Sequence, residues 1–298
     1  HKDPMSPPGR PLLSGCGSIL APLGQYINFF IQDFVPLHDT FVRHSSHLIG
    51  LIEGFPYDPE VQLLVTLDVM ALYTNIPQDQ GIAVVREVLD SRPRPHQVPT
   101  WFIVGLLKIA LEENYFRYNN SFYNQVCGTA MGAIFAPHLA NIFMHKFEHQ
   151  YILTEANPYR KNICWYKRYI DDILVIWTGD SLYLDEFVDY LHGTQSVLRV
   201  TFQHNHFSIP FLDLIIRHSE GQLITSLYRK DTDRNTLLHY ASFHPRYLRD
   251  GLPFGQFLRI RRNCSEREDY FREATLLQGR LIHRGYPRRL VRRALKRA

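Results

Sequence analysis

Two adjacent acidic residues, Asp171 and Asp172, precede an apolar run typical of a β-strand, residues 173–177. Paired carboxylates are costly to hold together, because each disfavours ionisation of the other unless a cation neutralises both. A divalent metal ion is the favoured explanation, and Mg²⁺ suits it because it takes oxygen ligands and leaves positions for water and substrate phosphates. An isolated Asp pair would be interpreted first as a polar turn.

A third acidic residue ends a similar segment upstream. Residues 63–67 form a near-continuous apolar run that predicts a buried strand, and Asp68 follows it. Carboxylates from separate strands allow two-metal phosphoryl transfer, in which one ion activates an attacking 3′-hydroxyl and the other stabilises the leaving pyrophosphate. Asp68 could otherwise simply end a strand, but together with Asp171 and Asp172 it supplies that set.

A glycine-rich segment lies between the two acidic strands. Gly128 and Gly132 are four residues apart and allow a tight bend or the close approach of a ligand. Pro137 belongs early in a helix, and the apolar residues at 139, 142, 143 and 147 continue at helical spacing. The loop could therefore present backbone to a nucleotide or to template, although most such loops alone are only loops.

In this order, the strand-ending Asp, the glycine-rich loop with its helix and the Tyr-x-Asp-Asp hairpin resemble the palm of reverse transcriptases. Segments 67–77, 128–132, 211–214 and 227–230 narrow the resemblance to Penelope-like retroelements, whose reverse transcriptase is similar to that of telomerase. The similarity covers nearly the whole chain. It implies an RNA-directed DNA polymerase that extends a DNA primer on an RNA template with dNTPs.

The resemblance also implies roles for single residues. Asp68 and Asp171 would bridge two Mg²⁺ ions, for which Mn²⁺ can substitute, and Asp172 would contribute less directly. Tyr73 matches the aromatic gate that occupies the space of a ribose 2′-hydroxyl, which argues for dNTP over NTP. Tyr169 would pack under the hairpin near the primer end. Without the motif, either tyrosine would be interpreted as a core aromatic.

Further substrate contacts are expected from the glycine loop and the start of the chain. Gly128, Met131 and Gly132 match the loop that faces substrate. Arg10 resembles the fingers arginine that reaches the incoming triphosphate, with Lys2 as a weaker candidate, because a guanidinium matches the geometry of phosphate oxygens. The family's motif normally begins upstream of His1, so the chain is expected to lack part of its fingers.

Past the acidic hairpin, residues 184–191 predict an amphipathic helix and residues 197–202 a strand. Related polymerases commonly place a lysine general acid after that strand, whereas this chain has His204 and His206. Histidine can protonate pyrophosphate because its ordinary pKa is close to neutrality, but both could also be surface residues. Asp213 is expected to fix a primer-gripping hairpin rather than to bind metal.

The C-terminal region is basic. Residues 255–298 carry 13 Lys or Arg against 4 acidic residues, a net charge of +9, whereas the preceding residues carry 20 against 25, a net charge of −5. An apolar stripe opposite basic residues predicts an amphipathic helix at the end of the chain. Its phosphate-facing residues would be Arg288, Arg289, Arg292 and Arg293. A solvated face or a nuclear-import signal would use the same residues.

The composition indicates the broad class of protein to which the chain belongs. The chain has 298 residues, 45% of them hydrophobic, enough for a sizeable core with two or three subdomains, and it shows no membrane-spanning run or signal peptide. The four cysteines have no C-x-x-C spacing, which argues against a zinc site or disulfide framework and for a reducing compartment.

We therefore predict an α+β right-hand polymerase with an antiparallel sheet backed by helices. Its parts would be partial fingers (1–60), a palm (61–235) with finger helices inserted at about 80–118, and a basic helical thumb (236–298).

Two other functions remain open. One is a related polymerase with an RNA product, and the other is a truncated or domesticated retroelement fragment that binds nucleic acid without turnover. No GIY-YIG endonuclease domain fits after Arg297, so nicking of target DNA is not expected. A nuclear location is expected, with the cytoplasm as the alternative, and the sequence does not indicate an oligomeric state.

Overall fold

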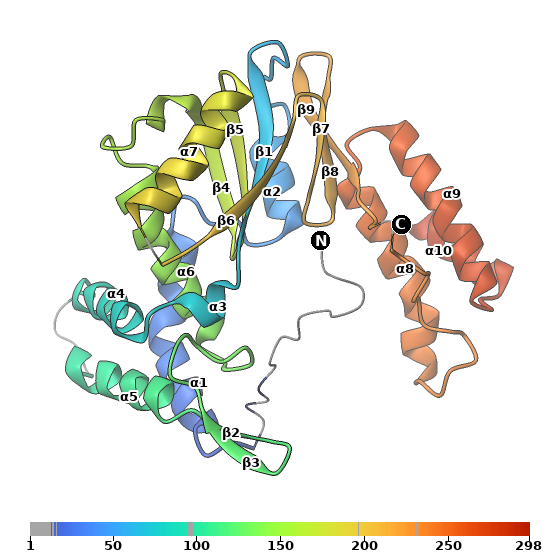
Figure 1. Ribbon diagram of the computed structural model, residues 1–298. Coiled ribbons are helices and arrows are strands. Elements are labelled where there is room, and N and C mark those ends of the chain that lie inside the picture. The colour runs from blue at the N-terminus through green and yellow to red at the C-terminus, as the bar shows by residue number, and fades with distance from the viewer. Residues whose placement is uncertain (1–12, 14, 16, 94–97, 196, 231) are drawn as a thin grey trace. The chain divides into compact units, whose positions relative to one another are not determined.

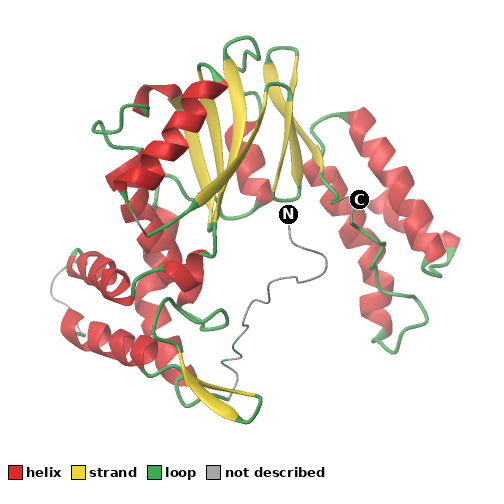
Figure 2. Cartoon of the chain, viewed as in Figure 1, coloured by secondary structure: helices red, strands yellow, loops and turns green. Residues whose placement is uncertain are grey.

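The computed structural model describes residues 13, 15, 17–93, 98–195, 197–230 and 232–298. It confirms the predicted mixture of helices and sheets (Figure 2). The chain divides into two compact units, and each is described by itself. Unit 1 comprises residues 1–41, 67–173 and 180–202, and unit 2 comprises residues 42–66, 174–179 and 203–298.

A four-stranded sheet carries the acidic residues, with its strands in the order β4-β5-β1-β6. The members are β4 (Ile163–Tyr169), β5 (Asp172–Thr178), β1 (Gln62–Val69) and β6 (Val200–Asn205). Buried side chains in β1 and β5 form near-continuous apolar runs, as the sequence predicted. A two-residue turn joins β4 to β5, so these strands form an antiparallel hairpin.

Unit 1 is mainly helical. Its helices are α1 (Ala21–Ile31), α3 (Leu72–Asn75), α4 (Gln78–Asp90), α5 (Thr100–Glu112), α6 (Ala136–Phe147) and α7 (Ser181–Thr194), with the short helices η1 (Gln32–Leu37), η2 (Glu148–Ile152) and η3 (Arg160–Asn162). α4 packs on α5 and α6, and α1 packs on α5 (Figure 1). The hairpin β2 (Tyr115–Tyr118) and β3 (Ser121–Asn124) follows α5.

The helices predicted after Pro137 and around residues 184–191 are confirmed as α6 and α7. The strand predicted at 197–202 begins later, at Val200. Buried Gln195 explains the shift, because its side-chain oxygen accepts hydrogen bonds from the backbone N–H groups of Val197 (2.7 Å) and Leu198 (2.8 Å). Their N–H groups are therefore not available for hydrogen bonds within the sheet.

Unit 2 combines a three-stranded antiparallel meander with helices. The strands are β7 (Ser208–Phe211), β8 (Leu214–Ser219) and β9 (Gln222–Leu227). The helices are α2 (Ser45–Ile52), α8 (Arg246–Asn263), α9 (Arg267–His283) and α10 (Arg288–Arg297). α8, α9 and α10 enclose a core of apolar side chains that includes Phe257, Leu277 and Val291.

Candidate active site

Asp68 and Asp171 lie on neighbouring backbone segments. Asp68 is exposed between the buried Leu67 and Val69, because side chains alternate between the two faces of a strand. The Val69 N–H donates to the Asp171 carbonyl (3.1 Å), so strand β1 passes directly beside the β4–β5 turn. Asp171 and Asp172 are half-buried in that turn and at the start of β5. The fold therefore brings together the backbone segments that carry acidic residues about a hundred positions apart in the chain.

The turn that carries Asp171 has an unusual backbone. Ile170 has a φ of 54°, in the left-handed region that β-branched residues rarely adopt. Ala71, three residues after Asp68, has a φ of 51°. Backbone of this kind costs about 1–3 kcal/mol per residue and persists where surrounding structure holds it, often at functional sites.

Arg168 supports the turn from within the core. Its guanidinium Nη1 donates to the Ile170 carbonyl (3.0 Å) and to Asn141 Oδ1 (2.8 Å) on α6. Its Nε pairs with Glu148 Oε1 at 2.5 Å, and both side chains are 0% exposed. Breaking a buried ion pair leaves a charge without its partner, which is costly, so such a pair holds its two side chains in place. The pair therefore fixes the turn relative to α6.

Glu148 has two further partners that complete this buried network. Thr40 donates its hydroxyl to Glu148 Oε2 (2.7 Å), and Tyr166 donates to Oε1 (2.9 Å). Burial and the charge of Glu148 raise the pKa of Tyr166 well above its ordinary value, so its hydroxyl stays a donor. The Thr40 carbonyl accepts from the Arg168 backbone N–H (2.7 Å).

Sequence reasoning missed this network. The available signal was the position of Arg168 on the same strand face as buried Tyr166, two residues apart, because a charge on a core face needs a buried partner. The identity of that partner could not be deduced, because Glu148 is distant along the chain.

Tyr73 lies close to the acidic turn. It is on the short helix α3 that follows β1, and burial, followed by the charge of Asp171 and the neighbouring Tyr169, raises its pKa to about 12. The phenol therefore remains protonated beside a carboxylate. The structure brings Tyr73, Tyr169 and Asp171 together, and the role of Tyr73 as a sugar gate stays a prediction.

The glycine loop is attached to the Tyr73 segment. The Thr129 N–H donates to the Tyr73 carbonyl (2.7 Å). Gly128 has a φ of 72°, and a Cβ added there would clash with the backbone of Tyr73 and Thr74. Only glycine allows this approach. Gln78, which sequence reasoning also missed, donates to the Gly128 carbonyl (3.2 Å).

Gly132 has a similar constraint on the other side of the loop. Its φ is 130°, and an added Cβ would overlap the carbonyl oxygen of Leu13. The Leu13 N–H donates to the Met131 carbonyl (3.1 Å). A cavity of about 830 Å³ opens beside the loop and is lined by residues of α1, α5, the β2 strand and the loop itself. Met131 and Gly132 therefore contact an upstream segment of the chain.

The predicted triphosphate-binding and general-acid residues lie outside the acidic turn and the glycine loop. Arg10, with its weaker alternative Lys2, lies outside the described residues. His204 lies on β6, and His206 follows that strand with its ring Nδ1 2.8 Å from the Pro59 carbonyl. Their role as general acid stays a prediction.

Asp213 fixes a hairpin turn to a helix. It lies between β7 and β8 beside Leu212, whose φ is 56°, and accepts hydrogen bonds from Arg259 (2.7 and 2.9 Å) and Asn263 (2.9 Å) of α8 and from Ser45 of α2. Its carbonyl accepts from the Tyr228 N–H (2.9 Å). These contacts attach the β7–β8 turn to α2 and α8, and the role of this hairpin at the primer stays a prediction.

The basic C-terminal residues lie on an amphipathic helix. α10 buries Val291 and Ala294 in the core of α8 and α9. The opposite face exposes basic side chains: Arg288, Arg289, Arg292 and Arg293. A four-residue turn from Arg284 to Pro287, with Gly285 at a φ of 81°, joins α9 to α10. This is a helix-turn-helix arrangement.

Acidic residues on adjacent strands, a tyrosine beside them and a glycine loop attached to that tyrosine define a palm-type nucleic-acid polymerase fold. Residues 19–207 match the reverse transcriptase (RNA-dependent DNA polymerase) family. The chain belongs to this family, since the match covers more than half of it. Residues 236–296 match the animal helix-turn-helix domain. A search of curated protein sequences gave no match.

Solved structures give the same fold. Telomerase from Candida albicans in complex with a fragment of telomeric RNA is 10% identical, with a TM-score of 0.60 over 89% of this chain and 47% of that one. The BmCPV RNA-dependent RNA polymerase at elongation state is 13% identical, with a TM-score of 0.53 over 88% of this chain and 24% of that one. The chain therefore spans less than half the length of these structures.

Proposed function

We propose that this chain is an RNA-directed DNA polymerase of a Penelope-like retrotransposon. It would extend a DNA primer on an RNA template by attack of the primer 3′-hydroxyl on the α-phosphate of a dNTP. The observation that carries the proposal is the backbone hydrogen bond between strand β1, which carries Asp68, and the turn that carries Asp171, with Tyr73 close to the Asp171 carboxylate. Family membership supports it, and the Penelope-like assignment rests on the motifs in residues 67–77 and 128–132.

The donor set fits divalent metal ions. Asp68, Asp171 and Asp172 offer carboxylate oxygens, the ligands that Mg²⁺ prefers, and Asp68 is exposed. These residues would hold two Mg²⁺ ions, or Mn²⁺ in their place. When bound, the ions activate the attacking hydroxyl and stabilise charge on the leaving pyrophosphate. Arg168 and Gln78 contribute by holding the turn and the loop in position before substrate arrives.

Tyr73 would select the sugar. Its backbone carbonyl accepts a hydrogen bond from Thr129, and its helix follows the strand that carries Asp68. A ring held in this way can exclude a 2′-hydroxyl by steric contact, which favours dNTP over NTP. Protonation of pyrophosphate would fall to His204 or His206.

The C-terminal helices would hold template and primer. α10 exposes four arginines on a face opposite its buried side, and cationic side chains of this kind bind phosphates irrespective of sequence. The match of residues 236–296 to a helix-turn-helix family supports a nucleic-acid contact by this region. We propose that these C-terminal helices are the thumb of the polymerase.

Primer extension tests the proposed function. A purified chain, an RNA template with a DNA primer, dNTPs and Mg²⁺ should give full-length product, and replacing dNTPs by NTPs should not. The alternative is a retroelement fragment that binds nucleic acid without turnover. A gel shift with the same template and primer, in the absence of any extension, would identify that alternative.

A further inference from the structure

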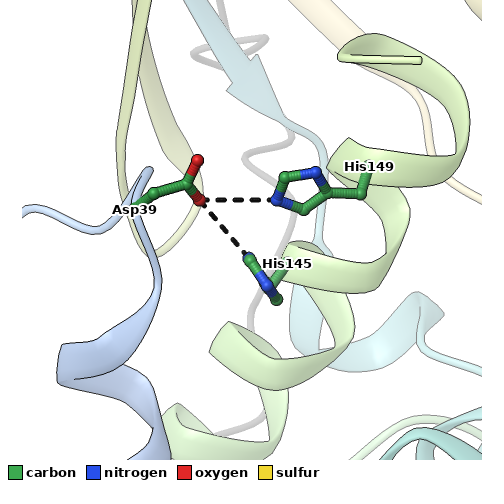
Figure 3. A group of neighbouring side chains, drawn as sticks. All are labelled: Asp39, His145 and His149. Carbon is green, nitrogen blue, oxygen red and sulfur yellow. Dashed lines mark hydrogen bonds and ion pairs between the residues drawn. The ribbon is translucent and has the colours of Figure 1, made fainter.

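A group of side chains with metal-ligand chemistry lies at the C-terminal end of α6. Within the described residues, Asp39, His145 and His149 place one possible ligand atom each so that all three lie within 4.8 Å of one another (Figure 3). His145 is in the last turn of α6, and His149 is one turn later in η2. Asp39 comes from the segment that follows η1.

The spacing is close to that of a bound transition metal. Asp39 Oδ1 lies 3.4 Å from His149 Nε2 and 4.0 Å from His145 Nδ1. Zinc bonds to nitrogen and oxygen of about 2.0–2.2 Å in a tetrahedron place neighbouring ligand atoms roughly 3.4 Å apart. The Asp39–His149 distance matches this spacing, and His145 would have to move closer to complete the set. A π-helical turn at this point also fits, because such turns are frequent at functional sites.

One imidazole nitrogen of the cluster is suited to bind a metal ion. His145 Nδ1 is buried and has no hydrogen-bond partner among the described residues.

Neighbouring side chains contact two of the three proposed ligands. The His38 ring stacks on His145 with centroids 3.9 Å apart and an angle of 3° between the planes. Lys167 Nζ donates to the Asp39 carbonyl (2.5 Å), which anchors that loop to β4. Asp39 itself is exposed, so solvent and ions can reach the site.

We propose that Asp39, His145 and His149 form a binding site for Zn²⁺, with water completing the tetrahedron. Two imidazoles and one carboxylate favour zinc over magnesium, which takes oxygen ligands. The absence of C-x-x-C spacing, which argued against zinc from the sequence, does not apply to a ligand set without cysteine.

A bound Zn²⁺ would have a structural role. Glu148 lies between the two histidine ligands in sequence and pairs with Arg168, while Thr40 follows Asp39 and donates to Glu148. An ion at this position joins the 38–41 segment to α6 at the point where the buried network begins. Zinc binding should therefore stabilise the fold of unit 1 without taking part in the reaction.

Calorimetric titration of the metal-free full chain with Zn²⁺ tests the proposal. The wild type should bind one Zn²⁺ in the presence of excess Mg²⁺, and its melting temperature should rise. His149→Ala and Asp39→Asn should each weaken this event by at least about tenfold, because each removes a ligand. Circular dichroism in chelator checks that both variants are folded, and His149 is exposed, so its loss should be tolerated.

The matched control is the double variant His44→Ala/His47→Ala. These two histidines also lie within one helical turn, at the start of α2, and their rings are 6.4 Å apart. This variant should bind Zn²⁺ as the wild type does. Equal affinity in the wild type and His149→Ala, or loss of binding in the control variant, would show an Asp39–His149 ion pair only and overturn the proposed site.

Discussion

The side chain of Tyr73 has a neutral hydroxyl beside the negative charge of Asp171, with a pKa of about 12. Its ring rather than its acidity is therefore the expected source of selectivity. Tyr73→Val should raise the kcat/KM of NTP relative to dNTP by at least about tenfold, because the space beneath the 2′ position opens. Tyr73→Phe keeps the ring and should keep the ratio. An unchanged ratio in Tyr73→Val would mean that this tyrosine only fills the core.

Arg168 is expected to affect both the stability of the chain and the proposed catalysis. Arg168→Met leaves Glu148 buried without its cation and should cost about 3–5 kcal/mol of the free energy of unfolding. Arg168→Met/Glu148→Leu removes both charges and should recover most of that loss. Its nucleotide incorporation should stay low, because the Ile170 carbonyl still lacks its donor. Denaturant unfolding and single-turnover incorporation measure the two effects, and a fully active double variant would contradict the positioning role.

At the scale of elements, the β7–β8 turn is attached to α8 through Asp213. Asp213→Asn should destabilise the chain by about 1–3 kcal/mol at pH 7, because charge-assisted hydrogen bonds are lost. Burial opposes ionisation of Asp213, but hydrogen bonds from Ser45 and Arg259 outweigh it and lower its pKa from 3.8.

The pH dependence of this contribution has a definite sign. Above pH 3.8 the carboxylate is ionised in both the folded and unfolded states, so its stabilisation is fully present. As the pH falls below that value, the unfolded chain takes up the proton first and the stabilisation is lost. The difference in unfolding free energy between wild type and Asp213→Asn should thus be smaller at pH 3 than at pH 7. A pH-independent difference would contradict the assignment.

The exposed arginines of α10 allow nucleic-acid binding to be tested separately from catalysis. If its exposed arginines contact phosphates, each removed contact should lower the slope of log K against log salt by roughly 0.7–0.9. Changing Arg288, Arg289, Arg292 and Arg293 to Gln should therefore flatten the slope for an RNA–DNA hybrid, while Lys161→Gln on η3 should not. Affinity measured at several salt concentrations gives the slopes. Equal slopes would identify a solvated face or an import signal.

For the whole molecule, the sequence predicted the elements that local patterns specify. The apolar run before Asp68, the helix after Pro137 and the amphipathic helix at the C-terminus were each found where the pattern placed them. These segments carry their own signal, because burial on one face of a strand or helix imposes a period on the residues.

The supports of the site could not be predicted in the same way. Arg168 and Glu148 are a pair only in the folded chain, and the need for glycine at 128 arises from the backbone of Tyr73 that lies against it. The late start of β6 depends on the side chain of Gln195. Contacts between distant segments have no local pattern, so only the structure reveals them.

The most direct test of the account separates chemistry from binding at the three aspartates. Single-nucleotide incorporation and template–primer affinity should be measured for the wild type, Asp68→Asn, Asp171→Asn and Asp172→Asn with Mg²⁺ at pH 7. We expect Asp68→Asn and Asp171→Asn to abolish incorporation, and Asp172→Asn to lower it less, with affinity within several-fold of the wild type throughout. Near-wild-type incorporation by Asp68→Asn or Asp171→Asn would contradict the central claim that these carboxylates hold the catalytic metal ions.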